Sequence, residues 1–178
     1  MSSHSGGSGS RDVIGVILAL RRELRAVPSD RSPEVAAEYL CDLFEGSMAA
    51  VNLMDYGRSR FHTVANVGEL VPREKRSPVG EYYAFADFPF TTQHLRRGAA
   101  YRSDLSDRSC PAEYREMLAA DRRTGCLGAP IRLNGTALGE FWVARNNEKP
   151  FSDVDEDLAA ACGATLARFC RTPWREAG

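Results

Sequence analysis

Three histidines and five cysteines are the side chains of this 178-residue sequence best suited to acid–base or nucleophilic chemistry. A Ser-His-Asp or Cys-His centre needs its nucleophile within hydrogen-bond reach of a base. His4 lies in a Ser/Gly-rich N-terminal stretch, His62 is expected in the middle of a strand, and His94 is expected on a short helix. The G-x-S-x-G, H-E-x-x-H and P-loop motifs are absent from the sequence. These residues therefore predict neither a catalytic centre nor a metal site, which would need clustered ligands.

The cysteines indicate the redox environment rather than a reaction. They are Cys41, Cys110, Cys126, Cys162 and Cys170, and no two of them form a CxxC pair. Cys162 and Cys170 would lie roughly 12 Å apart along a helix axis, which is too far for a disulfide. Because the count is odd and residues 1–10 lack the apolar core of a secretory signal, we expect a cytoplasmic protein.

Composition favours one domain with a hydrophobic core. Apolar residues make up 43% of the chain and the net charge is −1, so nothing in the charge balance favours nucleic-acid binding. No apolar run approaches the roughly 20 residues that span a bilayer, so no membrane partner is expected. We expect a flexible tail over residues 1–10, one domain over 11–172 and a C-terminal tail over 173–178.

Two helices are expected at the start of the chain. In the first, over Arg11–Val27, apolar residues recur at the steps of a coiled-coil seam; they are Val13, Ile17, Leu20, Leu24 and Val27. About two heptads are too few for a stable coiled coil alone, so this helix packs either on its own domain or on a partner chain. Ser32 and Pro33 begin the second helix, which is predicted to end at Gly46.

Alternating residues predict two strands, Met48–Asp55 and Arg60–Val67, joined by a turn. Residues expected to share a face are Ala49, Val51 and Leu53; Asn52 and Met54; and His62, Val64 and Asn66. A polar loop follows over 68–80. Beyond it we expect a helix over Thr91–Arg97 ended by Gly98, a strand over Ala100–Asp104 and a helix over Pro111–Asp121. Five aromatic residues crowd the stretch from 82 to 90, namely Tyr82, Tyr83, Phe85, Phe88 and Phe90.

The clearest local pattern runs from residue 125 to residue 170. Ala129–Leu133 and Gly139–Ala144 read as strands, and Asn134-Gly135 between them favours a tight hairpin. Ser152 and Asp155 form a capping-box pattern that begins a final helix. Its carboxylates at the first turn, such as Asp153 and Asp155, are expected to be solvated. Its apolar face is predicted from Val154, Leu158, Ala161, Thr165 and Phe169.

This last stretch resembles the C-terminal half of a GAF domain. The matching features are Pro130-Ile131 on a strand, the Asn134-Gly135 turn, Leu138-Gly139 on the next strand and the helix start at 151–155. The series Leu95, Gly98, Tyr101 and Asp104 is similar to the family's short helix, glycine and strand. The resemblance implies an α/β (α+β) fold with a central antiparallel sheet of about six strands. Terminal helices would cover one face, and loops and short helices the other.

In the resembled fold a ligand sits between the sheet and the middle connections, here 81–102 and 105–124. Such sites are usually apolar cavities with a few convergent polar groups. The resemblance therefore implies these ligand contacts: Asn52, Tyr83, Phe85, Phe90, His94, Tyr101, Arg102, Asp104 and Trp142. The same aromatic side chains could instead fill the space and seal a ligand-free core.

The resemblance implies a small-molecule-binding sensory domain of a bacterial regulatory protein. It would act as a homodimer and pass ligand occupancy through its terminal helices to a downstream signalling protein. One alternative is a ligand-free dimerisation or scaffold module. Another is a cysteine-dependent enzyme similar to the GAF-like reductases of free methionine sulfoxide, with Cys110 and Cys126 as candidates. The Cys-His pair of bilin-binding relatives is absent, His94 is a lone candidate haem ligand, and the cofactor stays unknown.

Overall fold

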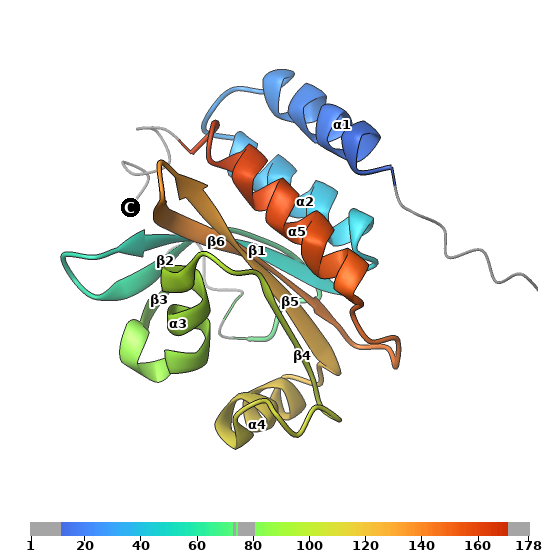
Figure 1. Ribbon diagram of the computed structural model, residues 1–178, viewed down its shortest axis with the longest axis vertical. Coiled ribbons are helices and arrows are strands. Elements are labelled where there is room, and N and C mark those ends of the chain that lie inside the picture. The colour runs from blue at the N-terminus through green and yellow to red at the C-terminus, as the bar shows by residue number, and fades with distance from the viewer. Residues whose placement is uncertain (1–11, 73, 75–80, 171–178) are drawn as a thin grey trace, which may run out of the picture.

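The computed structural model describes residues 12–72, 74 and 81–170 of the chain (Figure 1). Its helices are α1 (Val13–Arg25), α2 (Ser32–Leu43), the 3-10 turn η1 (Phe85–Asp87), α3 (Pro89–Arg97), α4 (Ala112–Ala120) and α5 (Asp153–Leu166). Its strands are β1 (Met48–Asp55), β2 (Arg60–Gly68), β3 (Tyr82–Ala84), β4 (Tyr101–Asp104), β5 (Gly125–Leu133) and β6 (Thr136–Arg145). The predicted tails at 1–10 and 173–178, and residues 73 and 75–80 of the predicted loop, lie outside the described residues.

Within the described residues, six strands form one antiparallel sheet in the order β3-β2-β1-β6-β5-β4. Figure 1 shows α2 and α5 on one face of this sheet with α1 outside them, and α3 and α4 on the other side. Each face has its own apolar core: Val51 and Phe141 belong to the core under the helices, and Met48 and Trp142 belong to the core on the opposite face. The predicted α+β architecture is confirmed.

Two local predictions are confirmed by backbone geometry. Asn134 and Gly135 adopt φ angles of 51° and 84°, and they join β5 to β6 in a tight hairpin. At the start of α5 the Ser152 side chain accepts from the backbone N–H of Asp155, and the Asp155 carboxylate accepts from that of Ser152. These interactions are local in sequence, which is why the sequence alone indicates them.

Helix α1 packs on its own domain through Leu20 and Leu24, which are buried against α2 and α5. Its opposite side is open, because Ile14 is 74% exposed and Leu18 is 58% exposed. The structure thus shows that the helix packs within its own domain, and it leaves an apolar stripe available to a partner.

The buried face of α5 matches the predicted one only in part, because Leu158 and Thr165 are buried as expected and Val154 is not. Gly163 rests on β5 so closely that a Cβ there would lie 2.3 Å from the Pro130 carbonyl oxygen. This contact turns Leu158, Cys162 and Leu166 toward the sheet and leaves Val154 45% exposed. The prediction that the Asp155 carboxylate is solvated is also wrong: Asp155 is 5% exposed, because it folds back onto Ser152.

A β-bulge in β2 makes a second prediction wrong, namely that His62, Val64 and Asn66 share one face of the strand. Val51 pairs with Ala65 whereas Asn52 pairs with Thr63, so Val64 is an extra residue in the ladder. The extra residue shifts the alternation, and as a result Phe61, Thr63 and Asn66 all border the same pocket. His62 therefore does not share a face with Asn66 as the simple alternation predicts. Instead its ring stacks on that of Tyr82 of the edge strand β3, 4.7 Å away.

Candidate functional site

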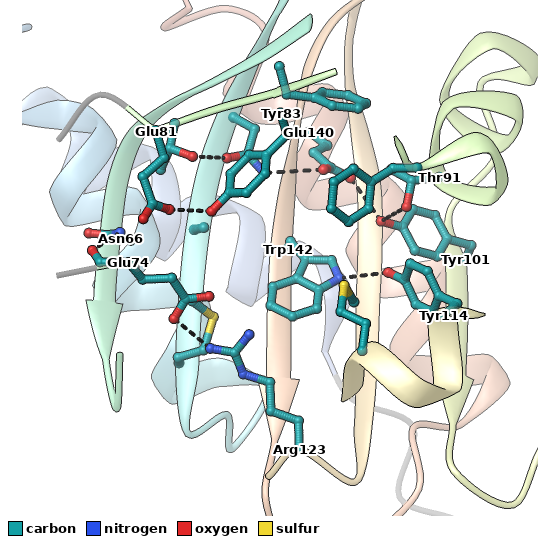
Figure 2. A pocket seen from close by; sticks show the side chains of 17 residues that line it. Asn66, Glu74, Glu81, Tyr83, Thr91, Tyr101, Tyr114, Arg123, Glu140 and Trp142 are labelled. Carbon is teal, nitrogen blue, oxygen red and sulfur yellow. Dashed lines mark hydrogen bonds and ion pairs between the residues drawn. The ribbon is translucent and has the colours of Figure 1, made fainter. Parts of the chain in front are cut away.

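A pocket of about 80 Å³ lies on the face of the sheet that α3 and α4 cover (Figure 2). Strands β1, β2, β4 and β6 form its floor, and α3, α4 and the segment before them contribute the remaining walls. Its lining residues are Met48, Ala50, Asn52, Phe61, Thr63, Asn66, Glu74, Glu81, Tyr83, Phe88, Thr91, Tyr101, Tyr114, Met117, Arg123, Glu140 and Trp142. The lining thus includes six aromatic side chains and three carboxyl groups.

Glu140 is the buried polar centre of this pocket, with 4% of its surface exposed. Tyr101 donates to its Oε2 over 2.9 Å and Asn52 donates to its Oε1 over 3.1 Å. Burial raises the pKa of Glu140 from 4.5 to about 7, although these two hydrogen bonds favour the ionised form. The carboxyl group therefore changes its charge near neutral pH.

A further pair of hydrogen bonds fixes the two donors. Thr63 donates to the Asn52 amide oxygen over 2.8 Å, and this bond orients the Asn52 NH₂ toward Glu140. Thr91 donates to the Tyr101 hydroxyl over 3.1 Å, so that hydroxyl is free to donate to Glu140. The network joins α3 to the four strands β1, β2, β4 and β6, as the dashed lines in Figure 2 show.

A neighbouring group of polar atoms surrounds the Tyr114 hydroxyl. The Trp142 indole N–H donates to it over 3.2 Å, and the Cys126 thiol lies 3.5 Å from it. Burial raises the pKa of Tyr114 and of Tyr101 well above the usual value for tyrosine, so both phenols stay neutral. Tyr114 thereby fastens α4 to the sheet beside the pocket.

Arg123 supplies the positive charge at the other end of the pocket. Its guanidinium is buried and lies 2.6 Å from the Glu74 carboxylate and 3.3 Å from the Asp121 carboxylate. Its Cζ also lies 5.0 Å from the centroid of the Trp142 ring. Figure 2 shows this ion pair well separated from Glu140. The charge of Arg123 is therefore already paired with two carboxylates, those of Glu74 and Asp121.

The residues predicted to contact a ligand fall into three groups. Asn52, Tyr83, Tyr101 and Trp142 line the pocket. Phe85, Phe90 and His94 pack behind its walls rather than lining it. The Phe90 ring centroid lies 5.6 Å from that of Tyr101, Phe85 packs edge-on against Phe61, and the His94 Nδ1 lies 2.9 Å from the Phe90 carbonyl oxygen.

Arg102 and Asp104 form the third group and do not line the pocket. Arg102 forms ion pairs with Asp153 and Glu156 of α5, on the other face of the sheet. The Asp104 carboxylate accepts from the backbone N–H of Ser106 over 2.8 Å and so stabilises the turn after β4. Side chains of a strand alternate between faces, so Tyr101 and Arg102 point in opposite directions.

Sequence reasoning missed Glu140, although a signal for it exists. Glu140 is the charged residue inside the apolar run Gly139–Ala144, and a carboxylate there must find partners or a ligand when the strand is buried. Thr63, Thr91 and Tyr114 carry no comparable signal. Their partners come from distant parts of the chain, and only the fold brings them together.

The cysteine environments do not favour thiolate chemistry. Burial raises the pKa of Cys110, and it raises that of Cys126 to about 12. A reactive thiol needs the opposite shift, because the thiolate is the nucleophile. Among the described residues, no group of three His, Cys, Asp or Glu side chains is placed to hold a metal ion. No helix in the described part of the chain is long and apolar enough to cross a membrane.

No protein-family model and no curated protein matches the sequence. Solved structures match its fold. The chromophore-binding domain of Stigmatella aurantiaca phytochrome P1 aligns with a TM-score of 0.73 at 11% identity, over 94% of this chain and 62% of that one. The GAF domain from a Coxiella burnetii phosphoenolpyruvate-protein phosphotransferase aligns with a TM-score of 0.72 at 16% identity, over 90% of this chain and 94% of that one. The phycocyanobilin-bound GAF domain from a cyanobacterial phytochrome aligns with a TM-score of 0.68 at 12% identity, over 89% of this chain and 96% of that one.

These alignments show that the chain has the fold of a GAF domain, as the sequence resemblance predicts. The chain spans 62% of the phytochrome fragment and nearly the whole of the two GAF domains. Identities of 11–16% establish the fold alone.

Proposed function

We propose that this domain is a sensor that binds a small molecule in the Glu140 pocket. The observation that carries the proposal is the buried Glu140 carboxyl group, which is held by Tyr101 and Asn52 at the wall of a cavity. Burying a carboxyl group is costly, and a packed apolar core would avoid that cost. A cavity with a few oriented polar groups is the usual form of a ligand site.

The size of the pocket limits the ligand. Sites for drug-sized ligands are roughly 300–1,000 Å³, and this one is about 80 Å³. Two of the similar structures are described as bilin-bound or chromophore-binding domains. A bilin is far larger than the pocket described here, so we propose a much smaller ligand for this chain.

A route for the signal runs through the sheet. Glu140 and Trp142 face the pocket, and Phe141 between them faces the helices, where its ring lies 6.1 Å from that of Phe44 at the end of α2. A ligand that shifts β6 therefore also shifts the packing of α2. The ligand has to bind two states of the domain unequally, since otherwise nothing is transmitted.

Untargeted mass spectrometry of the denatured, purified protein tests whether a small molecule co-purifies. The matched control is Ala50→Met, which places a longer side chain into the pocket from β1 without touching the helix face. We expect a molecule that is retained by the wild type and lost from the variant. The sensor proposal fails if no small molecule co-purifies with the wild type and if, in addition, no compound of a metabolite library changes the melting temperature of the wild type or of the variant.

The exposed stripe of α1 favours a second function, a dimerisation module that needs no ligand. Ile14 and Leu18 are large, exposed and one helical turn apart. Native mass spectrometry distinguishes the two functions, because a scaffold gives a dimer without a retained molecule. Leu18→Glu should dissociate such a dimer and leave the pocket intact. The homodimer and the downstream signalling protein expected for a sensor are likewise part of what we propose.

A further inference from the structure

The charge balance of the pocket narrows its ligand class, and this inference rests on the proposed sensor function. The ionisable carboxyl and guanidinium groups that line the pocket are those of Glu74, Glu81, Glu140 and Arg123. Arg123 is committed to Glu74 and Asp121. Among the described residues, no basic side chain forms an ion pair with Glu81 or Glu140. The described lining of the pocket therefore carries three carboxyl groups and one guanidinium group, which is already paired.

The hydrogen-bond capacity of Glu140 is only partly used. An ionised carboxylate offers about four acceptor positions, and the two donors of the structure, Tyr101 and Asn52, occupy one on each oxygen. An N–H group of a ligand could occupy a further position. A positive charge there would also offset the cost of burying the carboxylate, which no side chain of the described network does.

The aromatic walls favour the same ligand. Tyr83 and Phe88 border the pocket from the segment before α3, and Trp142 borders it from β6. The faces of aromatic rings carry partial negative charge and attract cations. Rings and a carboxylate around one small cavity therefore select against anions and favour an organic cation.

We propose that the pocket binds a small organic ammonium ion, with the Glu140 carboxylate as its counter-ion. A dry apolar cavity of roughly 150 Å³ holds one benzene molecule, so an 80 Å³ pocket takes something smaller. Primary or secondary alkylammonium ions of about two to four carbon atoms match this size by order of magnitude. They carry both the N–H donors and the charge.

Binding of such a cation is coupled to the proton on Glu140. The ionisable groups that interact with Glu140 are Tyr101 from β4, Tyr114 from α4 and Cys126 from β5. Glu81, Glu74 and Arg123 line the same pocket from the neighbouring connections. Tyr101, Tyr114 and Cys126 stay neutral at pH 6–8, because burial raises their pKa values. Glu140, with a pKa of about 7, is ionised in about a tenth of the molecules at pH 6 and in about nine-tenths at pH 8. Cation affinity therefore rises about tenfold over this range.

The test uses ethylammonium as the probe, with ethanol as its neutral counterpart and acetate as the anion, all in constant potassium chloride. Trp142 reports binding by fluorescence once Trp174, which lies outside the described residues, is replaced by Phe. We expect ethylammonium to bind with a dissociation constant of about 1 mM at pH 8, as suits so few atoms. Affinity should fall about tenfold at pH 6, and ethanol and acetate should not bind.

Glu140→Gln should weaken ethylammonium binding at least about tenfold and abolish its pH dependence. Glu113→Gln, at an exposed position on α4, is the matched control and should change neither. The pH dependence of the wild type keeps the test decisive if the Glu140→Gln variant folds poorly. Acetate or ethanol binding in place of ethylammonium would overturn the cation proposal and leave the sensor function standing. Absence of ethylammonium binding would overturn it too, and the metabolite screen then decides separately whether the pocket binds anything.

Discussion

The Tyr101 hydroxyl lies 2.9 Å from Glu140 Oε2, although β4 and β6 are separated in the sheet by β5. The tyrosine ring crosses over Gly128, the β5 residue that pairs with Tyr101 on one side and with Trp142 on the other. A Cβ at position 128 would lie 2.3 Å from the Tyr101 Cζ and 2.5 Å from its hydroxyl oxygen. The missing side chain of Gly128 is therefore what allows the two polar groups to meet.

Gly128→Ala should displace Tyr101 and destabilise the domain. We expect a loss of about 1–3 kcal/mol in the free energy of unfolding, which is typical of an overpacked core, measured by urea denaturation. Gly57→Ala is the control, because its Cβ would meet nothing closer than the Asp55 Oδ1 at 3.6 Å. In a Tyr101→Ala background the cost of Gly128→Ala should largely vanish. An unchanged cost there would show that Tyr101 is not the obstacle.

The elements that the sequence predicts well are those held by local interactions. The Asn134-Gly135 turn and the Ser152 cap each involve residues close to one another in the chain, so composition and spacing reveal them. The hydrophobic alternation of β1 likewise assigns Asn52 to the pocket face. These features suffice to indicate the fold and one side of the site.

The remainder of the site depends on contacts that spacing does not encode. Glu140 meets Asn52 across 88 residues and Tyr101 across 39. The bulge at Val64, which brings Asn66 to the pocket, breaks the alternation on which the strand predictions rely. The position of Arg102, in contrast, can be predicted from the sequence. Arg102 directly follows the buried Tyr101, and alternation along a strand places the two side chains on opposite faces of the sheet.

Glu140 should make the domain lose stability as pH rises through the neutral range. Its pKa is raised from 4.5 to about 7 in the folded state, so the folded chain holds a proton that the unfolded chain has released. This contribution is fully present below pH 4.5 and is lost as pH rises to about 7. It amounts to about 3 kcal/mol by order of magnitude. Urea unfolding of the wild type and of Glu140→Gln at about pH 4.5 and pH 8 measures it.

The comparison with Glu140→Gln is needed because other groups act in the opposite sense. Folding lowers the pKa of His62 and of Asp107, and each of these shifts adds stability as pH rises. Subtracting the two pH profiles removes such contributions. If the difference between the wild type and Glu140→Gln stays constant from acidic to mildly alkaline pH, Glu140 has no raised pKa.

Tyr101→Phe should raise the pKa of Glu140 still further. The hydrogen bond from the Tyr101 hydroxyl favours the ionised carboxylate, and its removal leaves burial less opposed. The variant should also cost about 1–2 kcal/mol in the free energy of unfolding, because Thr91 loses its acceptor. Carbon-13 NMR of labelled glutamate side chains follows the titration directly. Tyr39→Phe, which removes a bond to the Val16 carbonyl on the helix side, should leave the titration unchanged.

Arg102→Ala should leave ligand binding unchanged, because Arg102 pairs with α5 rather than lining the pocket. These ion pairs are partly exposed, so we expect a loss of at most about 1 kcal/mol in the free energy of unfolding. Asn52→Ala is the matched comparison, since it removes a hydrogen bond to Glu140 and should weaken binding of any ligand that Glu140 contacts. An Arg102 variant that folds normally but no longer binds would place the ligand elsewhere.

The thiols of the native protein should react slowly with Ellman's reagent, and this result bears on the redox-enzyme alternative. All five cysteines are buried, and with a pKa of about 12 the Cys126 thiol is ionised in only about one molecule in ten thousand at pH 8. Reaction then has to wait for the fold to open, so its rate should rise with urea and reach five thiols in full denaturant. Cys162→Ser, on the helix side of the sheet, is the control for Cys110→Ser and Cys126→Ser. A catalytic cysteine has to be both accessible and ionised, so it would react fast in the native protein. The redox alternative would be supported by one fast-reacting thiol that is lost in Cys110→Ser or Cys126→Ser and kept in Cys162→Ser.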